Sequence, residues 1–311
     1  MAVEVLQLMP LIASGDAALH GRYDVCRWYE VADPEAWLAA NGSAIRAVVT
    51  AGHLGITDAM MDKLPNLGIV AIAGVGFERV NLPKARDRGI RVTNTPDVLT
   101  EDVADMAVGL MIAAMRRIPD ADRHVRAGQW PKGELPLATK VWGRRYGIFG
   151  LGQIGEAVAR RLSGFGGTVA YTSRAEKPVP YTYHPTLLAL AEASDVLVVT
   201  AAASPATRHA VNREILEALG PSGYLVNVAR GSLVDEEALV TALRDGRLGG
   251  AGIDVYADEP NVPADLAALP NTALSPHVGS ATTDAREAMA TLMLRNLDAF
   301  TAGHPLPTPV V

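Results

Sequence analysis

One short stretch near the middle of the chain decides the fold, Gly150-Leu151-Gly152-Gln153-Ile154-Gly155. An apolar segment at 146–149 precedes it, and a helical pattern at 156–162 follows it. In this order of strand, turn and helix, the first glycine allows a tight turn, the second lets a pyrophosphate approach the backbone, and the third lets helix and strand pack closely. The N–H groups at the helix N-terminus then face the phosphates. This glycine turn therefore predicts dinucleotide binding, and the alternative is an ordinary turn in an α/β protein.

Short apolar runs with helical patterns between them lie on both sides of the glycine turn. Such alternation predicts βα units and parallel sheets. The second series contains six predicted strands, the number in a complete dinucleotide-binding sheet. Because the glycine turn lies in mid-chain, the first series must form a unit of its own, so we expect an α/β protein with two Rossmann-like or flavodoxin-like domains. The predicted strands are 3–8, 45–50, 69–73 and 90–93, then 146–149, 168–171, 196–200, 224–228, 251–255 and 272–274.

Two long helical patterns complete the outline. Residues 100–118 form one, with Thr100 as its N-cap, acidic residues near its start and Arg116 and Arg117 at its end. We expect this helix to connect the two domains. Residues 284–301 form the other, which we expect to pack back on the first domain.

Composition excludes several classes of partner. The 311 residues carry a formal net charge of −6 and no run of lysine or arginine, so we expect no nucleic-acid partner. Cys26 is the only cysteine, which excludes an intrachain disulfide and a cysteine-based metal cluster, and we expect a cytoplasmic protein with no metal site. Residues 1–10 are interpreted as a first strand, not a signal peptide. The longest apolar run, 107–115, is too short to span a bilayer, so no membrane partner is expected.

Cofactor choice depends on the residues about 20 positions beyond the glycine turn, where an acid accepts hydrogen bonds from the ribose hydroxyls of NAD. The sequence reads Tyr171-Thr172-Ser173-Arg174 there, with no acid. A carboxylate would repel a 2′-phosphate, whereas Arg174 can pair with it and Ser173 can donate to it. We therefore expect NADP(H) to be preferred. If Arg174 is instead a solvated surface residue, NAD(H) would serve as well.

Three polar residues follow strand-like segments in the second series: Arg230, Glu259 and His277. Ligands of such sheets gather at the carboxyl ends of the strands. Reduction of a 2-oxo acid needs a cation that holds the carboxylate and polarises the carbonyl, and an acid that protonates the developing alkoxide. Arginine and histidine supply these groups, and a glutamate can fix the histidine tautomer. Taken singly, each residue has an ordinary alternative: a helix cap, a solvated carboxylate and a local hydrogen bond.

Long motifs surround these three residues. They are VNVARGSLVDE at 226–236, GIDVY at 252–256 followed by Glu259-Pro260, and SPHVGSAT at 275–282, while NTPDVLT occupies 94–100. These motifs resemble the D-isomer-specific 2-hydroxyacid dehydrogenase family, and the likeness covers nearly the whole chain.

The resemblance implies a role for each residue. Arg230 would bind the 2-oxo acid, His277 would donate the proton, and Glu259 would pair with His277. Asp254 resembles the family residue that bonds the nicotinamide amide. The other implied cofactor contacts are Thr207, Val228, Ala229 and Gly279.

The resemblance also implies a domain layout. Residues 1–97 and 278–311 would form the substrate-binding domain, residues 98–277 would form the NAD(P)-binding Rossmann domain, and the active site would lie in the cleft between them. In the substrate-binding domain, Gly74-Val75-Gly76 resembles the loop whose N–H groups hold the substrate carboxylate, a plain turn being the alternative. We expect His53, Leu54 and Phe77 to face the acyl pocket, unless they serve ordinary packing.

Within the family, the likeness is greatest to hydroxypyruvate, glyoxylate and hydroxyphenylpyruvate reductases that favour NADPH. Ser173-Arg174, Lys177-Pro178, Tyr181-Thr182-Tyr183 and the ending at 306–311 carry this likeness. Ala202 is a departure, because the family often has proline there, and we expect a looser loop around the adenosine. The resemblance implies reduction of glyoxylate to glycolate and of hydroxypyruvate to D-glycerate.

Other functions stay open. One is an NAD-dependent dehydrogenase acting on another substrate, such as D-lactate, 3-phosphoglycerate, phenylpyruvate or hydroxyphenylpyruvate. Another is a dinucleotide-sensing, corepressor-like binding protein, which is disfavoured because the chain ends soon after Thr301. The resemblance also implies a homodimer. The Met-, Ala- and Val-rich helix at 100–118 agrees with burial against a second copy, and burial within the chain is the alternative that gives the same pattern. The segment flanked by Trp130 and Trp142 has two interpretations, a reach into a partner's active site and a simple packing role, of which packing is favoured.

Overall fold

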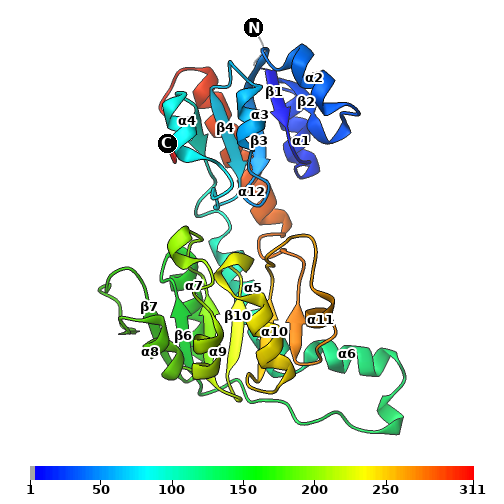
Figure 1. The fold of residues 1–311 in the computed structure, drawn as a ribbon, viewed down its shortest axis with the longest axis vertical. Coiled ribbons are helices and arrows are strands. Elements are labelled where there is room, and N and C mark those ends of the chain that lie inside the picture. Colours follow the sequence, from blue (N-terminus) through cyan, green and yellow to red (C-terminus); the bar gives the residue numbers. More distant parts are fainter. Residues whose placement is uncertain (1–3) are drawn as a thin grey trace. The chain divides into compact units, whose positions relative to one another are not determined.

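The structure, a computed structural model, describes residues 4–311, which divide into two compact units. The first unit runs to Leu99 and resumes at Ala281, and the second unit is Thr100–Ser280. Each unit contains one parallel sheet with helices on both faces (Figure 1). The expected fold class, an α/β protein with two parallel-sheet domains, is confirmed.

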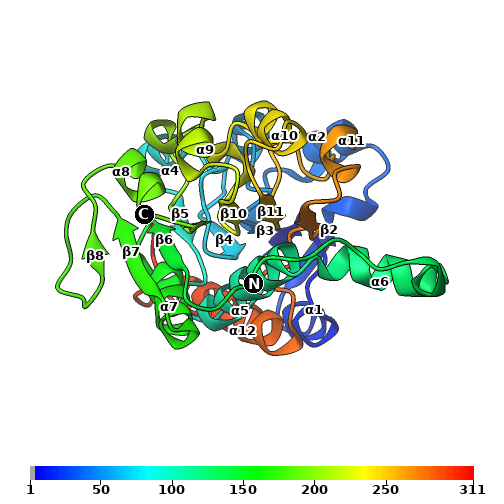
Figure 2. The same cartoon turned by 90° about the horizontal axis from the view of Figure 1, so that it is seen from below.

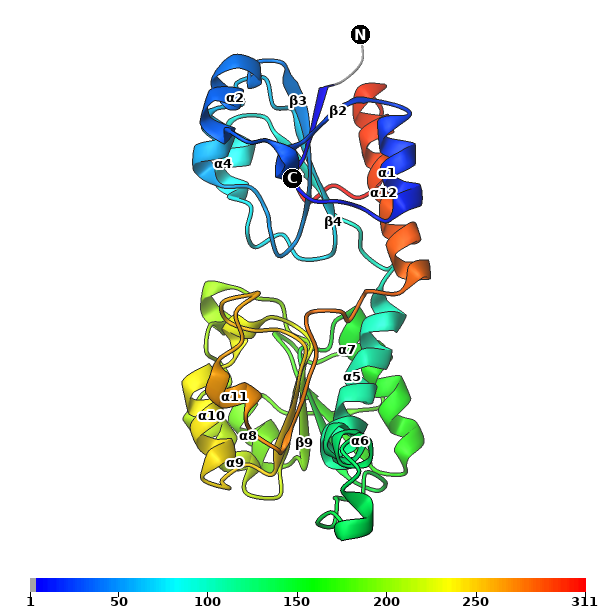
Figure 3. The same ribbon diagram turned by 90° about the vertical axis from the view of Figure 1, so that its right-hand side faces the viewer.

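The sheet of the first unit has five strands in the order β2-β1-β3-β4-β5. This is the flavodoxin-like order, in which ligands gather where the strand order reverses. Figure 3 shows α1 and α12 on one face of this sheet and α2 and α4 on the other. The strands are β1 (Glu4–Gln7), β2 (Asp24–Arg27), β3 (Ile45–Ala51), β4 (Ile69–Ala73) and β5 (Arg91–Thr93), and the helices are α1 (Ala13–His20), α2 (Pro34–Asn41), α3 (Asp58–Asp62), α4 (Leu82–Asp87) and α12 (Thr283–Thr301).

Strand β2 was missed by the sequence prediction. Its residues, DVCR, begin and end with an exposed charged side chain at the edge of the sheet, so no apolar run marks it. The predicted strand at 3–8 becomes β1, and its residue 3 lies outside the described residues. At the opposite edge the end of the chain bonds to β5, because the Val310 N–H donates to the Val92 carbonyl (2.7 Å).

The sheet of the second unit has seven strands in the order β12-β11-β10-β9-β6-β7-β8. The six strands from β8 to β11 have the order of a dinucleotide-binding sheet, and β12 is one strand added beside β11. The sequence predicted six strands and missed β8, which has only two residues and follows a proline-rich loop. The strands are β6 (Arg145–Phe149), β7 (Thr168–Thr172), β8 (Thr182–Tyr183), β9 (Val196–Val199), β10 (Tyr224–Asn227), β11 (Gly250–Ile253) and β12 (Thr272–Leu274).

Helices cover both faces of the second sheet (Figure 3). On one face lie α5 (Thr100–Met115), α6 (Ile118–Arg126) and α7 (Gln153–Leu162), and on the other lie α8 (Leu187–Glu192), α9 (Arg213–Leu219), α10 (Glu236–Arg244) and α11 (Ala264–Ala267). Five short 3₁₀ turns complete the described elements: Trp28–Glu30 in the first unit, and Trp130–Lys132, Ser163–Phe165, Pro205–Thr207 and Gly231–Leu233 in the second.

The single helix predicted at 100–118 is two helices. Helix α5 ends at Met115, and Arg117 adopts a left-handed conformation (φ 53°) before α6 begins. Pro119 explains the break, because proline lacks an N–H and its ring clashes with the carbonyl four residues earlier, which is that of Met115. That carbonyl instead accepts a hydrogen bond from the Thr139 N–H (2.8 Å). Helix α6 then leads away from the sheet (Figure 2).

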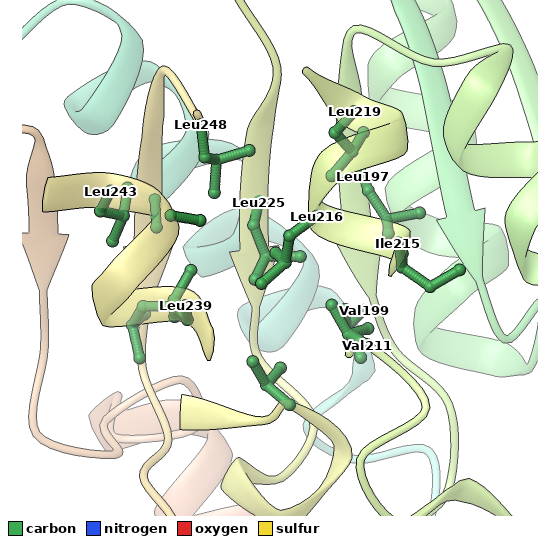
Figure 4. Packing of buried hydrophobic residues seen from close by; sticks show 14 of the residues in the cluster. Leu197, Val199, Val211, Ile215, Leu216, Leu219, Leu225, Leu239, Leu243 and Leu248 are labelled. Atoms are coloured by element: carbon green, nitrogen blue, oxygen red, sulfur yellow. The ribbon is translucent and has the colours of Figure 1, made fainter. Parts of the chain in front are cut away.

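An aliphatic core holds β9 and β10 against α9 and α10 (Figure 4). Leu197 and Leu225 of the strands and Leu216 and Leu243 of the helices all belong to this core, and all four are at most 3% exposed. Full burial of one such side chain contributes about 1.5–3 kcal/mol. This packing fixes the strands from whose carboxyl ends the polar residues of the site follow.

Candidate functional site

The glycine turn needs two of its three glycines for steric reasons. Gly150 has a φ of 97°, and a Cβ there would lie 2.4 Å from the Ala201 Cα. A Cβ at Gly155 would lie 2.2 Å from the Gly150 carbonyl oxygen. At Gly152, by contrast, a Cβ would meet no atom within 4 Å. The turn is therefore closed on the protein side and open at Gly152, as the approach of a phosphate to the backbone requires.

The first turn of α7 is suited to an anion. Its N-cap is Gly152, which has no side chain to accept from the N–H groups of the turn. Gln153 is exposed and Ile154 half-buried at the start of this helix, while Leu151 is buried beneath it. The N–H groups of a helix N-terminus carry partial positive charge, so they fit a pyrophosphate. The residues present thus fit a dinucleotide cofactor.

Two cationic side chains follow β7, and only one of them is paired. Lys177 forms an ion pair with Glu156 of α7 (Nζ–Oε1, 2.7 Å). Arg174 is exposed, and its side chain makes no hydrogen bond or ion pair with any residue in 4–311. The Ser173 hydroxyl donates to the Ala175 carbonyl (2.6 Å). Arg174 is therefore the cation of this loop that is available to a phosphate.

The loop after β9 is closed by a hydroxyl. Thr207 donates to the Ala202 carbonyl (2.9 Å) and accepts from the Ser204 N–H (2.8 Å). Ala202, at which a looser loop was expected, thus receives a hydrogen bond across the loop. After the next strand, β10, Val228 is buried, and the Ala229 N–H donates to the Asn227 side-chain oxygen (3.1 Å). These predicted cofactor residues all lie in loops after neighbouring strands.

His277 and Glu259 form a pair after β12 and β11. The His277 Nδ1 lies 2.7 Å from one carboxylate oxygen of Glu259, and the other oxygen accepts from the Tyr256 N–H (3.0 Å). Because an ionised carboxylate can only accept, Nδ1 carries a hydrogen in this pair. Nε2 is then the ring nitrogen that is not bonded to Glu259. Their side chains are 29% and 18% exposed, so the pair is largely shielded from water but reachable.

Asp254 builds the segment 275–279, which we call the histidine turn. Its carboxylate is buried and accepts from the Ser275 hydroxyl (2.5 Å), the Val278 N–H (2.9 Å) and the Gly279 N–H (2.9 Å). A Cβ at Gly279 would lie 2.9 Å from this carboxylate, so glycine permits the approach. Three donors occupy most of the acceptor capacity of a carboxylate. The structure therefore gives Asp254 a protein-building role that the sequence had not indicated.

The backbone and Tyr256 complete the histidine turn. The His277 N–H donates to the Asp254 carbonyl (2.8 Å) and holds His277 in a left-handed conformation (φ 54°). Burial raises the pKa of Tyr256 to about 12, so its phenol stays protonated and donates to the Ser275 carbonyl (3.0 Å). Sequence reasoning missed Tyr256 and Ser275, because nothing in the motif distinguishes their bonds across strands from ordinary packing.

Arg230 follows β10, which lies next to β11 in the sheet. The half-buried side chain donates to the Ala229 carbonyl (2.7 Å), and the Arg230 carbonyl accepts from the Asn227 side chain (3.0 Å). A Cβ on Gly231 would lie 1.9 Å from the Tyr256 carbonyl carbon, so this turn packs directly on the segment that leads to Glu259. The structure thus places the three predicted catalytic residues after three consecutive strands of one sheet.

The predicted substrate residues lie in the first unit, after β3 and β4. The Gly74 N–H donates to the Thr95 hydroxyl (2.9 Å), and the Val75 carbonyl accepts from the Asn94 side chain (2.8 Å). Within residues 4–311, no acceptor is found for the N–H groups of Val75 and Gly76. This loop therefore presents two successive amide donors, which suits a carboxylate.

Exposed apolar side chains border this amide loop. Leu54 is 43% and Phe77 38% exposed, and His53 is also exposed. The turn that carries Leu54 touches the loop after β4, because the Ile56 N–H donates to the Arg79 carbonyl (3.2 Å). The structure thus brings together the predicted substrate residues of the first unit.

In the part of the chain that the structure describes, no helix is long and apolar enough to cross a membrane. No group of three or more His, Cys, Asp and Glu side chains among those same residues could hold a metal ion.

Comparison with known proteins gives a family. Residues 108–279 match the sequence model described as D-isomer specific 2-hydroxyacid dehydrogenase, NAD binding domain. The chain is 47% identical over 311 residues to a hydroxyphenylpyruvate reductase of Plectranthus scutellarioides, covering 100% of this chain and 99% of the relative. It is 45% identical over the same length to a glyoxylate/hydroxypyruvate reductase of Arabidopsis thaliana, with the same coverage.

A solved structure is similar over the whole chain. It is an NADPH-dependent glyoxylate/hydroxypyruvate reductase of Sinorhizobium meliloti in complex with NADP and malonate, with a TM-score of 0.94 and 43% identity. The likeness covers 100% of this chain and 97% of that one.

Proposed function

The chain belongs to the D-isomer specific 2-hydroxyacid dehydrogenase family, and from that premise we propose that it is an NADPH-dependent reductase of small 2-oxo acids. The observation that carries the proposal is the His277–Glu259 pair at 2.7 Å, on a turn that Asp254 builds. Glyoxylate and hydroxypyruvate are the first substrates to test, because the similar proteins of Arabidopsis thaliana and Sinorhizobium meliloti are glyoxylate/hydroxypyruvate reductases.

The chemistry divides among side chains that the sequence singled out. When bound, the nicotinamide supplies a hydride to C2 of the 2-oxo acid. His277 donates the proton to the developing alkoxide, and the Glu259 carboxylate stabilises the imidazolium. Arg230 holds the substrate carboxylate and polarises the carbonyl. The N–H groups of Val75 and Gly76 hold the carboxylate as well.

The proposed roles of the two units follow from these residues. Residues 1–97 and 278–311 would bind substrate through the amide loop, and residues 98–277 would bind the cofactor through the glycine turn. The family match at 108–279, described as an NAD binding domain, supports the second assignment.

The preference for NADP(H) rests on Arg174. It is exposed and has no partner among residues 4–311, and it follows β7, where the ribose of the adenosine is read. An acid at this position would repel a 2′-phosphate, whereas a guanidinium can pair with it in bidentate geometry. The bound NADP of the Sinorhizobium meliloti structure supports the same choice.

A larger substrate is a second candidate. Leu54 and Phe77 present exposed apolar surface beside the amide loop, and a relative 47% identical to the chain is a hydroxyphenylpyruvate reductase. Each methylene buried against this surface would contribute about 0.8 kcal/mol to binding. An aromatic 2-oxo acid therefore belongs in the same substrate panel.

We also propose a homodimer formed through α6 and the segment that follows it. Large apolar side chains are exposed there, with Trp130 68%, Leu137 99% and Trp142 57% accessible. Large apolar side chains exposed close together often mark a protein interface, and two-fold dimers are the commonest soluble homo-oligomers. Sedimentation would separate a dimer from a monomer.

The test of the function is an assay of NADPH oxidation at the nicotinamide absorbance band with glyoxylate, hydroxypyruvate and hydroxyphenylpyruvate. We expect turnover of at least one substrate, and we expect His277→Ala to lower kcat by about 100- to 10,000-fold while NADPH binding is retained. A His277→Ala enzyme that reduces its substrate at the normal rate would show that His277 is not the proton donor. A wild-type protein that binds NADPH but reduces none of the panel would favour a binding protein.

A further inference from the structure

The loop that follows β7 is held in one shape by a side chain from within the sheet. Residues 173–181 lead from β7 to β8 and carry the exposed Arg174. Tyr171, the fourth residue of β7, has a fully buried side chain, yet its hydroxyl reaches this loop. It accepts from the Lys177 N–H (2.7 Å) and lies 3.3 Å from the Lys177 carbonyl, to which it donates. One phenol therefore fixes both backbone groups of a residue six positions further on.

Further bonds hold the first part of this loop, residues 173–177, which we call the 173–177 arc. The Ser173 hydroxyl donates to the Ala175 carbonyl (2.6 Å), and the Lys177 ammonium pairs with Glu156 of α7 (2.7 Å). The rings of Tyr171 and Tyr183 pack at 5.4 Å between centroids. Arg174 thus stands in a short loop whose two ends are both tied down.

We propose that Tyr171 is a positioning residue for cofactor selection, and that its hydroxyl holds the 173–177 arc so that Arg174 is presented to the 2′-phosphate of NADP(H). This inference rests on the proposed use of NADP(H). An arginine on a free loop loses side-chain and backbone freedom when it binds a phosphate, whereas a tied loop has already lost part of that freedom. Lys177 is neutralised by Glu156, so the selectivity depends on where Arg174 stands.

The test measures binding of adenosine 2′,5′-bisphosphate and of 5′-AMP by titration calorimetry, which needs no turnover. We expect the wild type to bind the bisphosphate more tightly. In Tyr171→Phe, which removes both hydrogen bonds to Lys177, we expect bisphosphate affinity to fall about fivefold while 5′-AMP affinity stays within about twofold. In turnover, KM for NADPH should rise and kcat at saturating NADPH should stay unchanged.

Tyr146→Phe is the matched control. Tyr146 is also a fully buried strand tyrosine whose hydroxyl donates to a backbone carbonyl, that of Val141 (2.6 Å), but it does not touch the 173–177 arc. We expect it to leave the preference for the bisphosphate intact. Equal losses in both variants, or equal losses for both ligands in Tyr171→Phe, would overturn the positioning role.

Two further outcomes separate this inference from the proposed function. If the wild type prefers the bisphosphate and Tyr171→Phe keeps the full preference, the inference is wrong and NADP(H) use stands. If the wild type shows no preference, NADP(H) selectivity is wrong and the inference falls with it. Should Tyr171→Phe not fold, Lys177→Ala and Lys177→Pro give the same comparison from the loop side, because both remove the ammonium and only proline removes the N–H. A greater loss of preference in Lys177→Pro supports the tether, and equal values overturn it.

Discussion

The glycine turn and the histidine turn both follow a strand of the second sheet, and they are built by opposite means. The glycine turn is shaped by the absence of side chains, since a Cβ at Gly150 or Gly155 would lie within 2.4 Å of another atom. The histidine turn is shaped by one side chain, Asp254, which accepts three hydrogen bonds from it. The three glycines stand within six positions of one another in the sequence, whereas Asp254 acts on residues more than 20 positions away. This difference explains why the glycine turn can be recognised from the sequence, whereas the hydrogen bonds that build the histidine turn cannot.

Gly150→Ala should have the largest effect of the changes considered. Alanine is strained at a φ of 97°, and its Cβ would clash with the Ala201 backbone, so we expect the free energy of unfolding to fall by about 3 kcal/mol or more. Gly152→Ala is the control, because its Cβ meets no atom within 4 Å. Gly152→Ala should unfold near the wild-type denaturant midpoint and lose dinucleotide affinity. Equal stability of the two variants would contradict the steric account of the turn.

Asp254→Asn tests the other device. The amide keeps one acceptor oxygen but turns an NH₂ group toward a backbone donor, so we expect a loss of about 2 kcal/mol in the free energy of unfolding and a lower kcat. Asp265→Asn, on exposed α11, is the control and should change neither quantity. Denaturant unfolding and steady-state assays provide the two measurements. An Asp254→Asn protein with wild-type stability and kcat would mean that the carboxylate does not hold the histidine turn.

Glu259→Gln separates charge from architecture within the histidine turn. The amide oxygen can still accept from the Tyr256 N–H, so we expect stability within about 1 kcal/mol of the wild type. The imidazolium of His277 loses its carboxylate, so we expect kcat to fall about 10- to 100-fold. The measurement is kcat at saturating substrate beside a thermal unfolding curve. Full activity in this variant would remove Glu259 from the proton-donor pair.

The smallest effect is expected in the cofactor preference, where Arg174→Ala is compared with Lys177→Ala. Arg174 has no partner among residues 4–311, whereas Lys177 is paired with Glu156. We therefore expect Arg174→Ala to lower the NADPH-to-NADH preference in kcat/KM by about tenfold, and Lys177→Ala to change it by about twofold. The reverse order would show that Lys177 reads the 2′-phosphate.

Local patterns predicted the fold class and most of its elements. All ten predicted strands start within one residue of an observed strand, because apolar runs bounded by polar residues signal burial on both faces of a parallel sheet. Strands β2 and β8 were missed because one is charged at both ends and the other has two residues. The break between α5 and α6 was missed although Pro119 marks it, since the apolar pattern continued across the proline.

The candidate site was predicted in part. Arg230, Glu259 and His277 were singled out by residue type and position after strands, and the structure places them after three consecutive strands. The contributions of Tyr256 and Ser275 could not be predicted, because each acts through a bond whose partner is fixed only when β11 and β12 lie side by side.

The sequence by itself determined the glycine turn, the parallel sheets and the identity of the polar residues, since these follow from residue type, spacing and hydrophobic periodicity over a few residues. The tertiary structure alone decided how Asp254 builds the histidine turn and how Tyr171 ties the 173–177 arc. Both depend on the direction of a hydrogen bond, which requires the angle and separation of two segments to be set. Packing of the whole sheet sets them, and no short stretch of sequence carries that information.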